Sequence, residues 1–163
     1  MKDSLKPLLI FFLFFFTVPL LANNVTDGIR LYKAKKYDKA ITYFMKPDAQ
    51  KNAAVLNYLG FMYNHGLGVQ KDESKGIEWY RKAAEKGLAR AQYNLGLCYE
   101  YGLGTHKNIP EAIEWYRKAA AQKHPEAEAK MGYFIVTGKG VKQDFKVARQ
   151  WYQRAIEHGS VHA

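Results

Sequence analysis

The side chains that most often carry catalysis are sparse in this 163-residue sequence. Serine occurs only at Ser4, Ser74 and Ser160. None of the three lies in a Gly-x-Ser-x-Gly turn, and none is followed three residues later by lysine, the two spacings in which an activated serine commonly performs acyl transfer. The sequence therefore predicts no catalytic serine.

Histidines and cysteines are the usual ligands of a metal centre. The five histidines are spread along the sequence, and no His or Cys pair has the spacing of a structural zinc site. His158 and His162 are four residues apart, but they lie near the C-terminal end. Glycine pairs such as Gly102-x-Gly104 follow predicted helices rather than strands, so we interpret them as turns and not as phosphate-binding loops. We predict no metal site, no cofactor, no catalytic residue and no enzyme activity.

The first 22 residues have the layout of a secretory signal peptide. Lys2 and Lys6 precede an apolar run that ends at Ala22, after which we expect cleavage. The run from Leu8 to Ala22 is 15 residues long. A helix that spans a bilayer needs roughly 20. The sequence therefore predicts a periplasmic or secreted protein. The alternative to cleavage is a signal segment that stays attached, and this segment would then be the only part of the protein that contacts the membrane.

Cys98 is the single cysteine, so no disulfide can form within the chain despite the predicted export. Met62 and Phe134 lie 36 residues before and after it. We therefore expect Cys98 to be a small buried hydrophobic residue rather than a reactive thiol.

The chain is strongly basic, with a formal net charge of +10. Removal of the signal segment, which carries Lys2, Asp3 and Lys6, leaves a net charge of +9. Basic proteins attract acidic partners, and predicted export argues against nucleic acid. The remaining candidates are a partner protein with an acidic surface, an anionic lipid or lipopolysaccharide, and an anionic cell-wall polymer.

A period of 36 residues dominates the sequence. It relates the glycines and aromatic residues Gly60, Gly96, Gly132, Trp79, Trp115, Trp151, Tyr80, Tyr116 and Tyr152. A fixed period of this length is typical of a solenoid. We predict three repeats within residues 53–163, at 53–88, 89–124 and 125–160.

Each repeat predicts a helical hairpin. In the first repeat, apolar residues recur every three to four positions before and after Gly66-Leu67-Gly68, where the glycines can end one helix and turn the chain. Residues 23–52 read as a degenerate tetratricopeptide-like hairpin with a shorter turn, which caps the stack. The predicted fold is all-α, an α/α solenoid of about eight short helices.

The repeats resemble those of the Sel-one-like family within the tetratricopeptide superfamily. LGFMYNHGLGVQKDESKGIEWYRKAAEKG and LGLCYEYGLGTHKNIPEAIEWYRKAAAQK carry the resemblance, which covers residues 53–159. It implies a right-handed superhelix with a concave groove, and in bacteria an exported adaptor or inhibitor. Cysteine-rich relatives linked to β-lactams have a disulfide pair in each repeat, which this chain lacks, so we do not carry that activity over.

The groove-lining positions of tetratricopeptide repeats can be transferred to the first helix of each repeat. They give a candidate partner-binding set of Asn57, Phe61, His65, Arg90, Tyr93, Leu97, Tyr101 and Tyr133. Tyrosine and arginine are frequent in the energetic centres of protein interfaces. We therefore predict a non-enzymatic periplasmic interaction module, of the adaptor, inhibitor or immunity type, that holds a partner protein in this groove.

Two further surfaces remain open from the sequence. The doublets Arg81-Lys82 and Arg117-Lys118 recur with the repeat and could form a basic face, so the alternative function is an envelope or host-surface factor that binds glycan or anionic lipid. The last helix, around Trp151 and Ile156, is the expected contact if the protein forms a homo-oligomer.

Overall fold

The computed structural model describes residues 24–160, which form eight α-helices, one short 3-10 helix and no strand. The predicted signal segment lies outside the described residues. The elements in chain order are α1 (Asn24–Lys33), α2 (Tyr37–Phe44), η1 (Ala49–Lys51), α3 (Ala53–His65), α4 (Glu73–Glu85), α5 (Ala89–Tyr101), α6 (Ile109–Ala121), α7 (Pro125–Thr137) and α8 (Phe145–Glu157).

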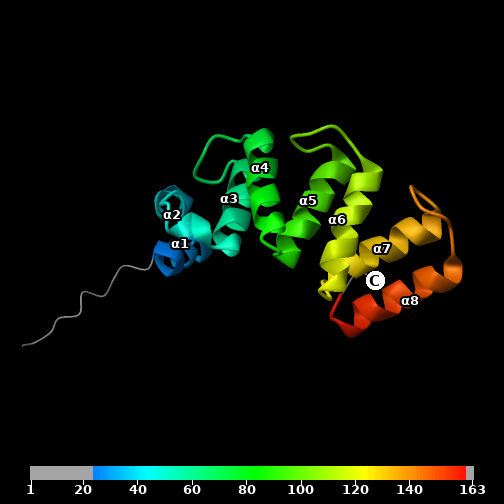
Figure 1. The fold of residues 1–163 in the computed structure, drawn as a ribbon. Helices are drawn as coiled ribbons and strands as arrows, with labels where there is room; N and C mark the ends of the chain where they lie inside the picture. The colour runs from blue at the N-terminus through cyan, green and yellow to red at the C-terminus, as the bar shows by residue number, and fades with distance from the viewer. Residues whose placement is uncertain (1–23, 161–163) are drawn as a thin grey trace, which may run out of the picture.

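The helices pair into four hairpins that stand side by side in a curved row, from α1 and α2 to α7 and α8 (Figure 1). We call α1, α3, α5 and α7 the A helices and α2, α4, α6 and α8 the B helices. Within the repeats each B helix packs on the A helix that follows it, α4 on α5 and α6 on α7. The predicted all-α solenoid is confirmed.

Polar side chains fix where the helices begin. The side chains of Asp72, Asn108 and Asp144 accept hydrogen bonds from backbone amides of the first turns of α4, α6 and α8, and Asn52 does the same for α3. Each cap contributes about 1 kcal/mol to stability. Asp72, Asn108 and Asp144 are spaced 36 residues apart, so every B helix of the repeats begins at the same point of its repeat.

Glycine allows the two helices of a hairpin to approach closely. A Cβ atom on Gly60 would lie 2.5 Å from the ring of Tyr80, and one on Gly96 would lie 2.6 Å from the ring of Tyr116. Both tyrosines are buried. The recurring glycine and tyrosine positions therefore build the hairpin core.

Cys98 belongs to the same core. It is only 1% exposed, and burial raises the pKa of its thiol to about 11. The thiol is therefore protonated near neutral pH, and the interpretation of Cys98 as a buried hydrophobic residue is confirmed.

The recurring basic residues of the B helices lie over tryptophan rings. The charged groups of Lys82, Lys118 and Arg154 lie 4.3, 3.9 and 4.5 Å from the ring centroids of the tryptophans three residues before them. Such cation–π contacts stabilise each B helix. The repetition of these cations therefore has a structural cause.

A second recurring link joins the A helix of a repeat to the end of the B helix of the same repeat. The side chain of Gln122 donates a hydrogen bond to Gln92, 30 residues earlier. At the matching positions of the next repeat, His158 Nδ1 lies 2.6 Å from Glu128 Oε2, and Arg154 Nη2 lies 3.0 Å from Glu128 Oε1. The Glu128 side chain is fully buried, so these two partners hold its carboxylate inside the last hairpin.

Candidate functional site

The face formed by α3, α5 and α7 carries two pockets, and we call it the A-helix face. The first pocket, of about 310 Å³, lies where α3, α4 and α5 meet and is lined by Phe61, Asn64, His65, Tyr80, Asn94, Leu97, Cys98, Tyr101 and Leu103. The second pocket, of about 260 Å³, is lined by Tyr93, Glu126, Ala129, Lys130, Tyr133, Tyr152 and Ser160.

Six of the eight residues predicted for partner binding line one of these two pockets, and the other two line neither. Phe61, His65, Leu97 and Tyr101 line the first pocket, and Tyr93 and Tyr133 line the second. Arg90 is exposed and lines neither pocket. Asn57 also lines neither, because its side chain is 7% exposed and accepts a hydrogen bond of 2.8 Å from Asn94.

The first pocket is built from amides and aromatic rings. The rings of Phe61 and His65 lie against each other, with centroids 4.1 Å apart. The amide nitrogen of Asn64 lies 3.8 Å from Cys98 Sγ, while its buried oxygen has no hydrogen-bond partner among residues 24–160. None of its lining residues is Asp, Glu, Lys or Arg, so this pocket offers mainly apolar and amide contacts.

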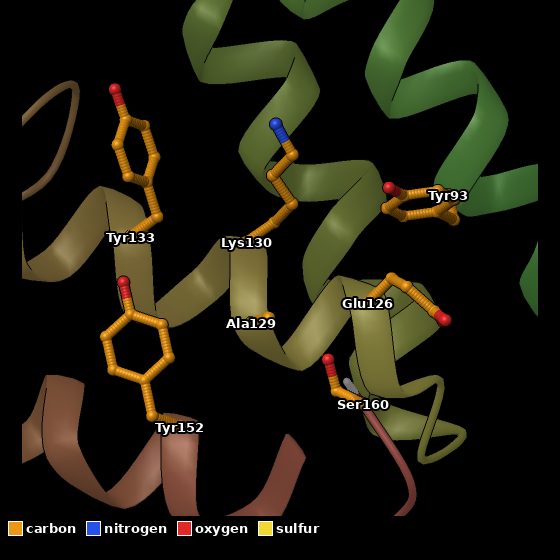
Figure 2. Close-up of a pocket in the computed structure, with 7 residues that line it drawn as sticks. All are labelled: Tyr93, Glu126, Ala129, Lys130, Tyr133, Tyr152 and Ser160. Carbon is orange, nitrogen blue, oxygen red and sulfur yellow. The ribbon is translucent and has the colours of Figure 1, made fainter. Parts of the chain in front are cut away.

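The second pocket contains charged side chains. Figure 2 shows Lys130 on α7 between Tyr133 and Tyr93, with the ring of Tyr152 rising from α8 below Tyr133. Glu126 projects from the first turn of α7 beneath Tyr93. This pocket therefore combines three tyrosine rings with one positive and one negative group.

Lys130 is held in place by the preceding repeat. Its ammonium group donates hydrogen bonds of 3.0 and 2.9 Å to the two carboxylate oxygens of Glu100, and one of 3.2 Å to the hydroxyl of Tyr101. The buried Glu100 also accepts a hydrogen bond of 2.6 Å from Tyr116. Burial lowers the pKa of Lys130, but the bonds to Glu100 and Tyr101 outweigh it and raise the pKa above its usual value.

Tyr93 is fixed by ring contacts at the edge of the second pocket. Its ring stacks on His124, with centroids 5.0 Å apart, and also lies 5.6 Å from Tyr116. Burial raises the pKa of Tyr93 and lowers the pKa of His124. Tyr93 is thus a half-buried wall of the pocket, whereas Tyr101 and Tyr133 are 59% and 41% exposed.

Neither Lys130 nor Tyr152 was among the candidate binding residues predicted from the sequence. Lys130 stands at the repeat position that Tyr58 and Asn94 occupy in the earlier repeats, and this variation was the available signal. Tyr152 matches two buried tyrosines but is itself only partly buried, because no described residue covers it as the following repeat covers Tyr116.

The described residues place no cluster of three metal-ligating side chains together. Among residues 24–160, no helix has the length and apolar character needed to cross a bilayer.

Comparison with known proteins identifies the repeats. A family model described as Sel1 repeat matches residues 53–88, 89–124 and 125–160. The chain belongs to the Sel1 repeat family. Sel1 repeat proteins generally bind partner proteins and are generally non-enzymatic scaffolds.

Solved Sel1 repeat structures share the fold. A Sel1 repeat protein from Oxalobacter formigenes is 56% identical with a TM-score of 0.82, and the match covers 85% of this chain and 55% of that chain. The protein c5321, a protective antigen present in uropathogenic Escherichia coli strains, is 34% identical with a TM-score of 0.79, covering 85% of this chain and 30% of that one.

A more distant structure is the cysteine-rich protein B of Helicobacter pylori, 25% identical with a TM-score of 0.62, where the match covers 77% of this chain and 90% of that chain. A search of curated proteins found no match. The chain thus spans about half or less of the Oxalobacter and Escherichia proteins, and all three solved structures come from bacteria.

Proposed function

We propose that the A-helix face binds a segment of one partner protein across the two pockets. The observation that carries this proposal is the position of the exposed aromatic side chains. Phe61, Tyr101 and Tyr133 are 36%, 59% and 41% exposed, and all three lie on this face. Exposed aromatic residues beside shallow pockets are typical of the energetic centre of a protein interface.

The second pocket supplies rigid contacts for such a segment. Because Glu100 holds the ammonium group of Lys130, the lysine keeps one position instead of moving freely in solvent. A side chain fixed before binding loses little conformational entropy when a partner docks. A partner group that reaches Tyr133 would therefore meet a preformed wall.

The charge on the A-helix face differs from that of the whole chain. The two pockets together contain one lysine and one glutamate, whereas the chain carries a net charge of +10. We therefore propose that shape and aromatic contacts select the partner segment. The predicted attraction to acidic partners acts over longer distances and is screened by salt.

The cellular role proposed for this interaction is that of an exported adaptor or inhibitor, of the scaffold or immunity type. The predicted signal segment of residues 1–22 supports a periplasmic or secreted location. The described fold also resembles c5321, whose name describes a protective antigen of uropathogenic Escherichia coli, a property expected of proteins that reach the cell exterior.

A second candidate is an envelope factor that binds glycan or anionic lipid through a basic face. One observation favours it: an open pocket on α8 is lined by Lys146, Arg149, Gln150, Gln153 and Arg154, with no acidic residue. Binding there would weaken strongly as salt rises and would not depend on the tyrosines of the A-helix face.

Co-purification tests the two candidates. Residues 23–163, which contain every described helix, are used to capture proteins from the periplasm of the cell that encodes them. We expect one protein at near-equal stoichiometry, lost with Tyr101→Ala or Tyr133→Ala and kept with Glu78→Ala on the exposed side of α4. Retention on envelope fragments that is abolished by salt and unaffected by the tyrosine variants would reject the first candidate in favour of the second.

A further inference from the structure

Among residues 24–160, nothing covers the outer face of α8, whereas the matching faces of α4 and α6 are covered. Four positions spaced at 0, 4, 7 and 11 form one stripe along a helix. In α4 and α6 the last three of these positions are buried under the next A helix, at Ile77, Tyr80, Ala84, Ile113, Tyr116 and Ala120, none of which is more than 4% exposed.

In α8 the same stripe consists of Phe145, Arg149, Tyr152 and Ile156. Phe145 is 67% exposed and Ile156 is 56% exposed, while Arg149 is exposed and Tyr152 is partly buried. Trp151, which the sequence suggested as a contact, lies outside this stripe, half-buried under Arg154. The stripe on α8 is thus not covered by any described residue, although the matching stripes on α4 and α6 each pack on the next A helix.

The opposite end of the solenoid does not offer a matching surface. Alignment of Gly28 with Gly60 places Asp27 and Arg30 of α1 at the positions of Leu59 and Met62, which are fully buried. Asp27 and Arg30 form an ion pair of 2.7 Å. Stacking α8 of one copy on α1 of another would press apolar side chains onto charged ones, so head-to-tail assembly is disfavoured.

We propose that α8 is the contact surface of a two-fold homodimer, in which the α8 helices of two copies pack antiparallel. With the axis between Gln150 and Trp151, this arrangement sets Phe145 opposite Ile156 of the second copy. It also sets Arg149 over the ring of Tyr152 of the second copy. The stripe is thus self-complementary, as a two-fold interface requires.

Charges at the edge of the stripe fit the same arrangement. Lys146 and Glu157 project from one flank of α8, because eleven residues correspond to about three helical turns. In an antiparallel pair like flanks meet, so Lys146 of each copy approaches Glu157 of the other. Two ion pairs would therefore border the apolar contact and offset part of the repulsion between the two basic chains.

The proposed dimer contact and the proposed partner site are different surfaces that share one residue. Tyr152 belongs to the α8 stripe and also lines the second pocket. Arg149 of the second copy would therefore lie near one wall of that pocket. Since one helix from each copy makes a small interface, the dissociation constant should be on the order of 0.1 mM.

Paired cysteine variants test the geometry directly. In the proposed dimer Phe145 and Ile156 of different copies face each other, whereas the two copies of Phe145 are about 16 Å apart along the helices. A disulfide forms only when Cα atoms lie within about 7 Å. A mixture of Phe145→Cys and Ile156→Cys chains at about 0.1 mM should therefore cross-link under oxidation, and neither variant should cross-link alone.

The control is a mixture of Glu78→Cys and Ile156→Cys chains, which should not cross-link because Glu78 is exposed on α4, away from the stripe. Sedimentation of residues 23–163 should show a monomer–dimer equilibrium that Phe145→Glu abolishes. A monomer at all concentrations up to about 0.5 mM, or equal cross-linking by single variants, would overturn the proposal. Because Phe145 lines neither pocket of the A-helix face, Phe145→Glu should leave partner binding intact. Loss of the dimer can therefore be distinguished from loss of the proposed function.

Discussion

Two pairs of A-helix residues, Asn64 with Asn94 and Glu100 with Lys130, stand at matching positions of consecutive repeats but differ in chemistry. Asn64 and Asn94 line the first pocket, whereas Lys130 lines the second and is held by Glu100 of the preceding repeat. The neighbouring helices α4 and α6 carry buried tyrosines at matching positions. The comparison shows that the repeat fixes the scaffold, while the few A-helix positions that differ between repeats give each pocket its own chemistry.

The largest expected effect comes from breaking the ion pair between Lys130 and Glu100. Lys130→Met leaves the buried Glu100 without a cation, which should lower the free energy of unfolding by about 3 kcal/mol. The matched change Asn94→Leu in the first pocket removes one amide hydrogen bond and should cost about 1 kcal/mol. Urea unfolding followed by circular dichroism measures both.

The combined variant Glu100→Gln with Lys130→Met identifies the cause of this loss. Because the amide carries no charge, the double variant should be more stable than Lys130→Met alone. If the double variant is less stable than Lys130→Met, the buried charge is not what makes the second pocket sensitive.

Substitutions of Glu100 and of Asn64, which stands at the same repeat position, should also differ in their effect on stability. Glu100→Leu takes hydrogen-bond partners from Lys130 and Tyr116 and should cost about 2 kcal/mol. Asn64→Leu, at the same repeat position, removes an amide oxygen that has no hydrogen-bond partner, and should change stability by less than about 1 kcal/mol. Equal losses in thermal or urea unfolding would mean that the two pockets do not differ in the way described.

Alkaline pH should weaken the second pocket selectively. The pKa of Lys130 is raised above its usual 10.5, so the folded protein holds this proton more tightly than the unfolded chain. The resulting stability is complete below about pH 10.5 and is lost as pH rises through the raised pKa. The difference in stability between the wild type and Lys130→Met should therefore shrink above that pH, while the difference for Asn94→Leu stays constant.

The smallest effect on stability is expected from protonation of His124, at the edge of the second pocket, in acid. Burial lowers the pKa of His124 below 6.5, so stability is complete above pH 6.5 and falls as pH decreases toward the lowered value. The matching residue of the preceding repeat is Leu88. His124→Leu should remove this part of the acid sensitivity, and an unchanged slope of stability against pH would contradict the prediction.

The fold could be predicted from the sequence because its causes repeat. Gly60 and Gly96 must be small to admit Tyr80 and Tyr116, and this requirement recurs every 36 residues. The variation at the repeat position of Lys130 could be read from the sequence, but its contact with Glu100 of the preceding repeat could not. Asn57 was expected in the groove but is buried, since its oxygen is taken by Asn94, a contact that spans two repeats and that no period reveals.

The central claim is that the A-helix face holds the partner protein, and site-specific photo-cross-linking tests it most directly. A photoreactive phenylalanine analogue is placed in turn at Phe61, Tyr101 and Tyr133, and at Glu78 and Glu114 on the exposed sides of α4 and α6. In the cell that encodes the protein, irradiation should yield the same single adduct from the three A-helix positions and none from the other two. Adducts from Glu78 and Glu114 alone, or no adduct from any A-helix position, would contradict the account.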